Sequence, residues 1–282
     1  MVRSVVVIAA VFSASIVACS SADADSSATL EQGVSEAPPQ AHVRWQKKGG
    51  GGGSSLLVDH GGKVLPTSHT YAIFWGTPSA FPSDATSGLE SLLAGFGGSG
   101  YLAIANQYLR GGSATSFFVA GYSDPSSPPS HSPKTSTIVG EACSVINANG
   151  LTADTDALYV VFTSNFPHVG FCAWHDHGSC NGVDIQVAYL PNTAGVGGCD
   201  PGNLFNCNSY SQGTRSIADS LAHEFMETVT DPDISAWYDQ NGQEIGDKCN
   251  FNYGSCVKLG NGTSWQLQKE WSNAAGGCVQ SL

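Results

Sequence analysis

The chain has 282 residues, of which 11 are basic and 23 acidic, so its formal net charge is −12. Only 12% of the residues are charged, and 34 are glycines. Because nucleic-acid binding depends on a basic face, this composition predicts no nucleic-acid partner. The low charge and the many glycines are more typical of an extracellular protein than of a cytosolic enzyme.

The first residues predict export. Arg3 is the only charged residue before Asp23, and an apolar segment follows it at residues 5–17. A basic start followed by about 7–15 apolar residues is typical of a secretory signal peptide, and the segment is too short to span a bilayer. The sequence IVAC that ends at Cys19 fits a lipobox. We therefore predict a signal peptide at residues 1–18 and lipidation of Cys19, with an ordinary signal peptide as the alternative.

These features predict an extracellular or cell-envelope location, with membrane contact only through the lipid anchor. Residues 19–57 are predicted to form a disordered tether. Residues 20–39 contain almost no large apolar side chains, and residues 49–53 are five consecutive glycines. Only Val43-Arg44-Trp45, between these two stretches, has side chains that would dock. One folded domain is expected over residues 58–282.

Within this domain the pattern predicts strands alternating with helices. The predicted elements, in chain order, are a strand at 71–75, a helix capped by Ser83 or Asp84, helical spacing at 101–109, and strands at 117–122 and 157–162. Residues 158–162 are apolar throughout, which is typical of a central strand. The fold class predicted is α+β, a mixed sheet with packed helices, for which a zincin-like arrangement is one option.

The cysteines predict disulfide bonds. Of the nine, Cys19 is set apart, and the remaining eight are Cys143, Cys172, Cys180, Cys199, Cys207, Cys249, Cys256 and Cys278. In an oxidising compartment this even number predicts up to four bridges, whose connectivity the sequence leaves open. Free or metal-binding thiols are the alternative, but no pair has CxxC spacing. Residues 170–213 hold four of the eight and are predicted to be loops in which bridges replace a core.

A helix is predicted at residues 214–230. Ser216 and Asp219 fit a capping box at its start, and Asp231-Pro232 would end it. Apolar side chains fill one arc of the helix and polar side chains the other.

The polar arc contains an HExxE motif, in which His223 and Glu227 lie one turn apart. Two ligands at this spacing can hold one metal ion, as in the HExxH zinc helix, and Glu224 beside them could take a proton from the attacking water. With more oxygen than nitrogen ligands, the set is less selective for zinc. The alternative is that these residues are the solvated face of a surface helix.

A third ligand would come from elsewhere in the chain. The acidic residues after the helix that could return to it are Asp231, Asp233, Asp239, Glu244 and Asp247. The segment His175-Asp176-His177 is the other histidine cluster, with a solvated loop as its alternative. The predicted ligands are His223 and Glu227 with one of Asp231, Asp247 or His175, and Glu224 is the predicted catalytic residue.

Several ordered motifs resemble one known family. They are residues 61–65 and 71–76, the segment 170–172 with His175, the helix and turn at 222–232, the segments 237–238 and 244–249, and Trp271 with Cys278 and the end of the chain. Together they make residues 58–282 resemble the EXORDIUM-like, or phosphate-induced, proteins. The resemblance implies an extracellular protein from a family tied in plants to growth, with no firmly attached activity. Many plant members lack the His-Glu pair, and the lipobox and glycine tether lie outside the family pattern.

Three functions remain open on the sequence. The first is a zinc-dependent hydrolase of peptidase type, with Zn²⁺ as its cofactor and a peptide as its partner. The second is a non-catalytic protein that binds cell-wall polysaccharide by stacking tryptophans on sugar rings; these are Trp75, Trp174, Trp237, Trp265 and Trp271. The third is a structural site for Ca²⁺, since oxygen ligands dominate the neighbourhood.

Overall fold

The computed structural model describes residues 43–45 and 55–282. The predicted signal peptide and Cys19 therefore lie outside the described residues. Within the described part of the chain, no helix is long and apolar enough to cross a membrane.

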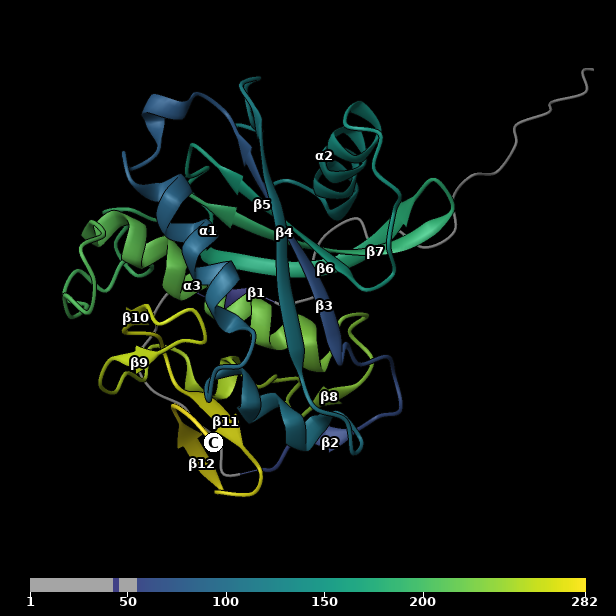
Figure 1. Cartoon of the computed structure of the whole chain (residues 1–282), viewed down its shortest axis with the longest axis vertical. Helices are drawn as coiled ribbons and strands as arrows, with labels where there is room; N and C mark the ends of the chain where they lie inside the picture. Colours follow the sequence, from purple (N-terminus) through teal and green to yellow (C-terminus); the bar gives the residue numbers. More distant parts are fainter. Residues whose placement is uncertain (1–42, 46–54) are drawn as a thin grey trace, which may run out of the picture. The chain divides into compact units, whose positions relative to one another are not determined.

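The centre of the fold is a mixed sheet of five long strands and one short strand (Figure 1). The strands are β1 (Val43–Trp45), β3 (Thr67–Trp75), β4 (Thr115–Asp124), β5 (Ala157–Thr163), β6 (Phe171–Cys180) and β7 (Val183–Pro191). Their order is β1-β6-β7-β5-β3-β4. The pairs among β3, β4, β5 and β7 are parallel, whereas β6 is antiparallel to both β7 and β1. The predicted mixed sheet is therefore confirmed.

Helices cover both faces of this sheet. They are α1 (Ala85–Phe96), α2 (Thr135–Ala148) and α3 (Gln212–Thr230), with 3-10 turns η2 (Pro78–Ala80), η3 (Leu102–Tyr108) and η4 (Asp247–Cys249). Helix α2 packs on β5, β6 and β7, while α3 packs on β6, β7 and α1. Successive side chains of β5 point to opposite faces of the sheet, so they belong to two different cores. Leu158, Val160 and Phe162 join the core with α1 and α3. Tyr159 and Val161 join the core with α2. The expected central strand is confirmed, since every residue of β5 is buried.

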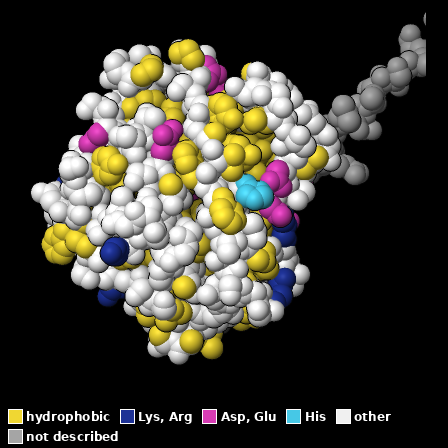
Figure 2. Space-filling model, viewed as in Figure 1, with side chains coloured by type: hydrophobic (Ala, Val, Ile, Leu, Met, Phe, Trp, Pro, Cys, Tyr) yellow, Lys and Arg dark blue, Asp and Glu magenta, His cyan; other side chains and the backbone are white. Residues whose placement is uncertain are grey.

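Short strand pairs surround the rest of α3. They are β2 (Val58–Asp59) with β8 (Trp237–Tyr238), β9 (Val257–Lys258) with β10 (Ser264–Trp265), and β11 (Glu270–Ser272) with β12 (Gly277–Val279). Residues of this C-terminal part, such as Trp265 and Leu267, join the same core as α1 and α3. Charged side chains are sparse over most of the face shown in Figure 2, and acidic side chains lie beside a histidine and basic side chains at its right edge.

The prediction that residues 170–213 are loops is wrong for the first half of this range. Strands β6 and β7 form an antiparallel hairpin inside the central sheet. Asn181 and Gly182 connect them, with φ angles of 54° and 80°. An Asn-Gly pair with both φ angles positive is the preferred two-residue hairpin turn. The sequence pattern did not indicate β6 because its side chains are polar. They are buried because they make polar contacts, not because they belong to an apolar core.

Helix α3 differs from its prediction in two ways. It begins at Gln212, and the hydroxyl of Ser211 caps it by accepting the backbone N–H of Thr214, so the capping box at Ser216 is wrong. The carboxylate of Asp84, at the start of α1, accepts the backbone N–H of Ser211 and fixes this end of the helix. The helix is also no surface helix, since its polar arc is as buried as its apolar arc. It ends at Thr230, as predicted.

All eight cysteines of the domain are paired, which confirms the prediction of disulfide bonds. The pairs are Cys143–Cys180, Cys172–Cys199, Cys207–Cys256 and Cys249–Cys278. The first joins α2 to the end of β6, and the last joins η4 to β12. Four bridges are consistent with a protein that folds in an oxidising compartment outside the cytoplasm.

Two parts of the segment predicted as a tether belong to this fold. Val43–Trp45 form β1 at the edge of the sheet, and Leu57 is buried in the core of α1 and α3. The folded part of the chain therefore includes residues before Val58.

Candidate metal centre

The centre is built on one stripe of α3. Asp219, His223 and Glu227 follow one another at intervals of four residues, so they lie above each other on the helix. All three side chains are fully buried. Nε2 of His223 lies 3.1 Å from Oε1 of Glu227, which confirms that the two side chains face the same point. Neither nitrogen of His223 makes a hydrogen bond of standard geometry within the described part of the chain.

Strand β6 brings a second histidine to this stripe. His175 points from β6 toward α3, because it shares a strand face with Ala173 of the α1–α3 core. Its Nδ1 lies 3.2 Å from Oε2 of Glu224 and 3.6 Å from Oε2 of Glu227. His175 is thus part of the centre, and the solvated-loop alternative for it is excluded because the residue is buried.

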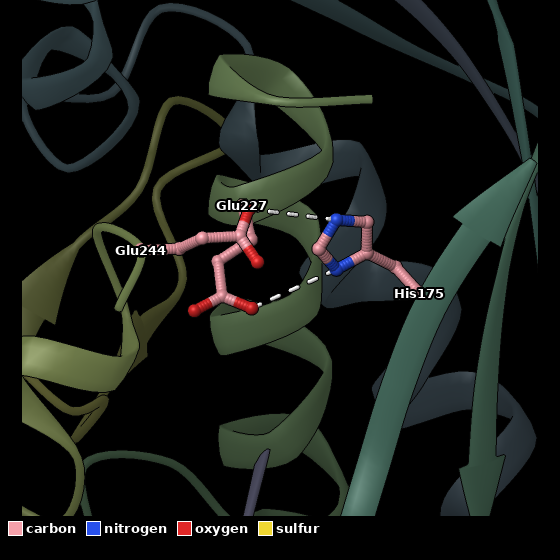
Figure 3. A group of neighbouring side chains, drawn as sticks. All are labelled: His175, Glu227 and Glu244. Carbon is pink, nitrogen blue, oxygen red and sulfur yellow. Dashed lines mark ion pairs between the residues drawn. The ribbon is translucent and has the colours of Figure 1, made fainter. Parts of the chain in front are cut away.

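The segment after β8 supplies two further carboxylates. Oε1 of Glu244 lies 3.7 Å from Nε2 of His175, and Figure 3 shows Glu244, Glu227 and His175 converging. Oδ1 of Asp247 lies 3.7 Å from Nε2 of His223, and its backbone N–H donates to Oε1 of Glu227 at 3.0 Å. Helix, strand and C-terminal segment therefore meet around Glu227.

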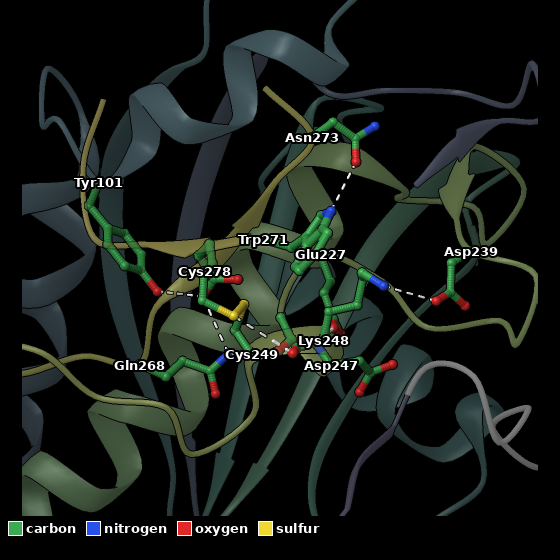
Figure 4. The surroundings of a disulfide bond; sticks show 12 residues. Tyr101, Glu227, Asp239, Asp247, Lys248, Cys249, Gln268, Trp271, Asn273 and Cys278 are labelled. Carbon is green, nitrogen blue, oxygen red and sulfur yellow. Dashed lines mark hydrogen bonds and ion pairs between the residues drawn. A yellow bond between two sulfur atoms is a disulfide. The ribbon is translucent and has the colours of Figure 1, made fainter. Parts of the chain in front are cut away.

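Contacts around η4 hold this segment against α3. Cys249, which forms a disulfide bond with Cys278, lies two residues after Asp247 (Figure 4). Lys248 donates to Asp239 at 2.9 Å and lies 4.4 Å from the ring centroid of Trp271. Asp239 was one of the acidic residues considered as a metal ligand. Its carboxylate instead forms an ion pair with Lys248.

Gly246 allows the closest approach of this segment to the centre. A Cβ atom there would lie 2.8 Å from Nδ1 of His223 and 2.9 Å from Oε1 of Glu227, which is too close for any side chain. Glycine at position 246 therefore lets the backbone at the start of η4 approach His223 and Glu227 without displacing their side chains. The carbonyl oxygen of Gly246 also accepts a hydrogen bond from Gln268 at 3.0 Å.

These side chains form two overlapping groups that could hold a metal ion. One group is His223, Glu224 and Glu227, and the other is His175, Glu227 and Glu244; within each, one ligand atom per residue lies within 4.8 Å of the others. Two ligands at about 2.1 Å from a tetrahedral ion are about 3.4 Å apart. The observed separations of 3.1 to 3.7 Å between nitrogen and oxygen atoms bracket this value.

Of the predicted ligands, Asp231 has a different place. It caps the end of α3, and its Oδ1 accepts the backbone N–H groups of Ser235 and Ala236, both at 2.6 Å. Only its backbone carbonyl reaches the centre, 3.3 Å from Nε2 of His175. Asp231 therefore shapes the turn after the helix and belongs to neither group.

Asp233 lies in a separate group, with His177 and Asp184, whose three side chains are half-exposed. Glu244 is the residue that the predicted ligand set missed. It was one acid in a downstream cluster, and only the fold shows that it returns to α3.

Burial dominates the electrostatics of the centre. It raises the pKa of Glu224 to about 8, and together with the nearby Glu227 it raises the pKa of Asp247 to about 8. Burial and neighbouring carboxylates hold the pKa values of Glu227 and Glu244 well above their usual range. Burial lowers the pKa of His223. The folded chain alone thus disfavours the ionised carboxylates, and a cation among them would favour ionisation.

The tryptophans do not form an exposed platform. Trp174, Trp265 and Trp271 are buried, and Trp75 and Trp237 are half-buried. Three of the five side chains considered for sugar stacking are therefore part of the cores.

No protein-family model, no curated protein and no solved structure matches this chain. The resemblance to the EXORDIUM-like proteins thus rests on the sequence motifs alone.

Proposed function

We propose that this protein is an exported zinc-dependent hydrolase of peptidase type. The observation that carries the proposal is the convergence of two buried histidines, His223 and His175, on the buried carboxylate of Glu227. The resemblance to EXORDIUM-like proteins and the lipobox at Cys19 support a place in the cell envelope. A mixed sheet with the HExxE helix packed on one face supports a zincin-like arrangement.

The residues fit a divalent cation. Four carboxylates converge on two imidazoles, and burying carboxylates without a positive partner is costly. Oε1 of Glu224 and Oε2 of Glu227 accept no hydrogen bond from the described residues, so both have electron pairs to offer. Imidazole nitrogens with a carboxylate oxygen are a common zinc ligand set. His223 and Glu227 would hold the ion, and His175, which belongs with Glu227 to the second group, is the proposed third ligand.

Each residue then has a role in hydrolysis. A bound zinc ion supplies a Lewis acid, which polarises the carbonyl of a peptide bond and makes water easier to deprotonate. Glu224 takes the proton of the attacking water and returns it to the leaving amine. Burial raises the pKa of Glu224 in the metal-free chain, and a bound cation would favour the ionised carboxylate, which is the form that accepts the proton.

A structural calcium site is the second candidate. It is favoured by the number of carboxylates, since Glu244 and Asp247 add oxygen ligands that a zinc centre does not need. Calcium would stabilise the junction of α3 and η4 without any hydrolysis.

Metal analysis of the purified full-length protein separates the two. The zinc proposal predicts about one zinc ion per chain and hydrolysis of an unfolded protein substrate that a chelator abolishes and zinc restores. Calcium restoring thermal stability while zinc has no effect would support the structural site. A purified protein that contains no zinc and binds none would overturn the zinc proposal.

A further inference from the structure

The edge of the sheet beside the metal centre is covered by a segment from before the domain. β1 pairs antiparallel with β6, with Val43 opposite Trp174 and Arg44 opposite Ala173. A short extended segment that adds to an exposed sheet edge is a general mode of peptide binding, in which side-chain pockets give the specificity. β1 therefore has the geometry of a bound peptide.

Arg44 of this segment lies in a pocket that offers its guanidinium a carboxylate, an amide and an aromatic ring, while its Nη1 makes no hydrogen bond within the described residues. The side chain is fully buried. One guanidinium nitrogen donates to Oδ2 of Asp219 at 2.5 Å, and Nε donates to Oδ1 of Asn250 at 3.3 Å. The guanidinium carbon lies 4.7 Å from the ring centroid of Phe251. An anion, an amide and an aromatic face together recognise arginine better than lysine.

The pocket is built independently of Arg44. Oδ1 of Asp219 accepts the backbone N–H of Gln268 at 2.8 Å, and Oδ2 accepts the hydroxyl of Tyr253 at 2.8 Å. These bonds come from the C-terminal part of the chain, so they orient the carboxylate without help from β1.

The pocket also adjoins the metal centre. Asp219 lies one helical turn, about 5.4 Å, before His223 on α3. The residue opposite Arg44, Ala173, lies on the same strand face as His175. A peptide in the position of β1 therefore passes the groups to which hydrolysis is assigned.

We infer that the centre takes extended peptides that carry an arginine, and that Val43–Trp45 is the chain's own occupant of this peptide position. As a substrate class for the same site, the inference rests on the proposed function. If β1 served only to complete the sheet, it would not need an arginine. A buried guanidinium is stable only where it has partners. Residues 46–54, which include five consecutive glycines, connect the occupant to the domain. Because the occupant belongs to the same chain, it competes with a free peptide as an intramolecular ligand.

The experiment measures binding of a fluorescent peptide with the sequence of residues 41–47 to the full-length protein. Fluorescence anisotropy compares the wild type with Arg44→Ala. Arg44→Ala is expected to bind the peptide at least about tenfold more tightly than the wild type, because its own segment competes less. The same peptide with alanine in place of arginine should bind Arg44→Ala at least about tenfold more weakly. Arg110→Ala, which removes an exposed arginine paired with Asp59, is the matched control and should behave as wild type.

Equal binding by the wild type and Arg44→Ala, or equal binding of the two peptides, would overturn the inference. Since Arg44→Ala leaves Asp219 without its cation, Arg44→Lys is measured beside it. Lysine keeps the charge but cannot bind Asp219 and Asn250 together, so this variant should bind the arginine peptide more tightly than wild type. A folded Arg44→Lys protein that does not do so also counts against the inference.

The same measurement separates this inference from the proposed hydrolase. Peptide binding by a protein that holds no zinc would support the peptide position and refute the hydrolase. Zinc binding and hydrolysis without preference for the arginine peptide would support the hydrolase and refute the inference.

Discussion

Nε2 of His223 and Oε1 of Glu227 lie 3.1 Å apart in a fully buried part of the protein, without the alignment of a hydrogen bond. The two groups are one turn apart on α3, so the helix itself fixes their separation. His175 from β6 approaches the other oxygen of this carboxylate, with its Nδ1 3.6 Å from Oε2 of Glu227. This relationship leads to predictions on metal binding, catalysis and stability.

Replacing His223 with alanine removes a ligand of the proposed metal ion, whether that ion is zinc or calcium. We expect zinc affinity to fall at least about 100-fold, measured by competition with a chelating dye. His69→Ala is the control, because His69 is partly exposed and pairs with Asp154 at the far end of β3. An unchanged zinc affinity in His223→Ala would show that the helix motif binds no metal.

Glu224→Gln should separate binding from chemistry. Glutamine keeps the size of the side chain but cannot accept the proton of water, so kcat should fall about 10²- to 10⁴-fold while zinc content stays unchanged. Glu141→Gln is the matched control, since Glu141 is a buried glutamate of α2 on the opposite face of the sheet. Full activity in Glu224→Gln would remove Glu224 from the mechanism.

Gly246→Ala should weaken metal binding through crowding. The new Cβ would lie under 3.0 Å from His223 and Glu227, so both side chains must move. We expect about a tenfold loss of zinc affinity with the fold retained. Gly140→Ala on α2 is the comparison, because a Cβ there meets no atom within 4 Å and alanine favours a helix. Equal zinc affinity in the two variants would contradict the close approach of η4.

The metal-free protein should lose stability as the pH rises. The pKa values of Glu224 and Asp247 are raised to about 8 in the folded chain, so the folded state binds protons that the unfolded state releases. This contribution to stability is complete below about pH 4 and is lost as the pH rises through about 8. The free energy of unfolding should fall by up to about 1.4 kcal/mol per pH unit for each carboxyl.

Denaturant unfolding at pH 5 and pH 8 tests this slope, with a chelator and with saturating zinc. Zinc binds the ionised carboxylates and competes with protons, so it should flatten or reverse the slope. The same slope with and without zinc would mean that the ion binds elsewhere.

The Cys249–Cys278 bridge should support the centre as well as the fold. Changing both cysteines to serine is expected to cost about 2–4 kcal/mol of stability and to lower zinc affinity, because η4 carries Asp247. Serines at Cys143 and Cys180 should cost a similar stability without lowering zinc affinity, since that bridge lies on the α2 side. Calorimetric titration with zinc checks both. Equal zinc affinity in the two variants would contradict the role given to η4.

The sequence predicts the local parts of this structure better than their assembly. The strand at 157–162 is predictable because both of its faces are apolar, and the HExxE spacing already places His223 and Glu227 together. The hairpin of β6 and β7 was missed although Asn181-Gly182 signals it, because the polar residues of β6 disguise a buried strand.

Long-range contacts set the rest of the centre. His175 and Glu244 are far apart in the chain, and only the packing of β6 and η4 on α3 brings them within 3.7 Å. No local pattern separates Glu244 from Asp233 or Asp239, which are also acidic and lie closer to the end of the helix in the sequence. The burial of the polar face of α3 was likewise unpredictable, because it depends on the C-terminal segment that covers it.

The distribution of the bridges divides the domain by redox chemistry. All eight paired cysteines lie at or after Cys143, so β3, α1 and β4 contain none. This first part is held by packing alone and does not depend on oxidation. The second part contributes His175, Glu244 and Asp247, and it contains every bridge. A chain kept reduced would therefore lack the covalent support of its candidate metal centre, and that support would form only in an oxidising compartment.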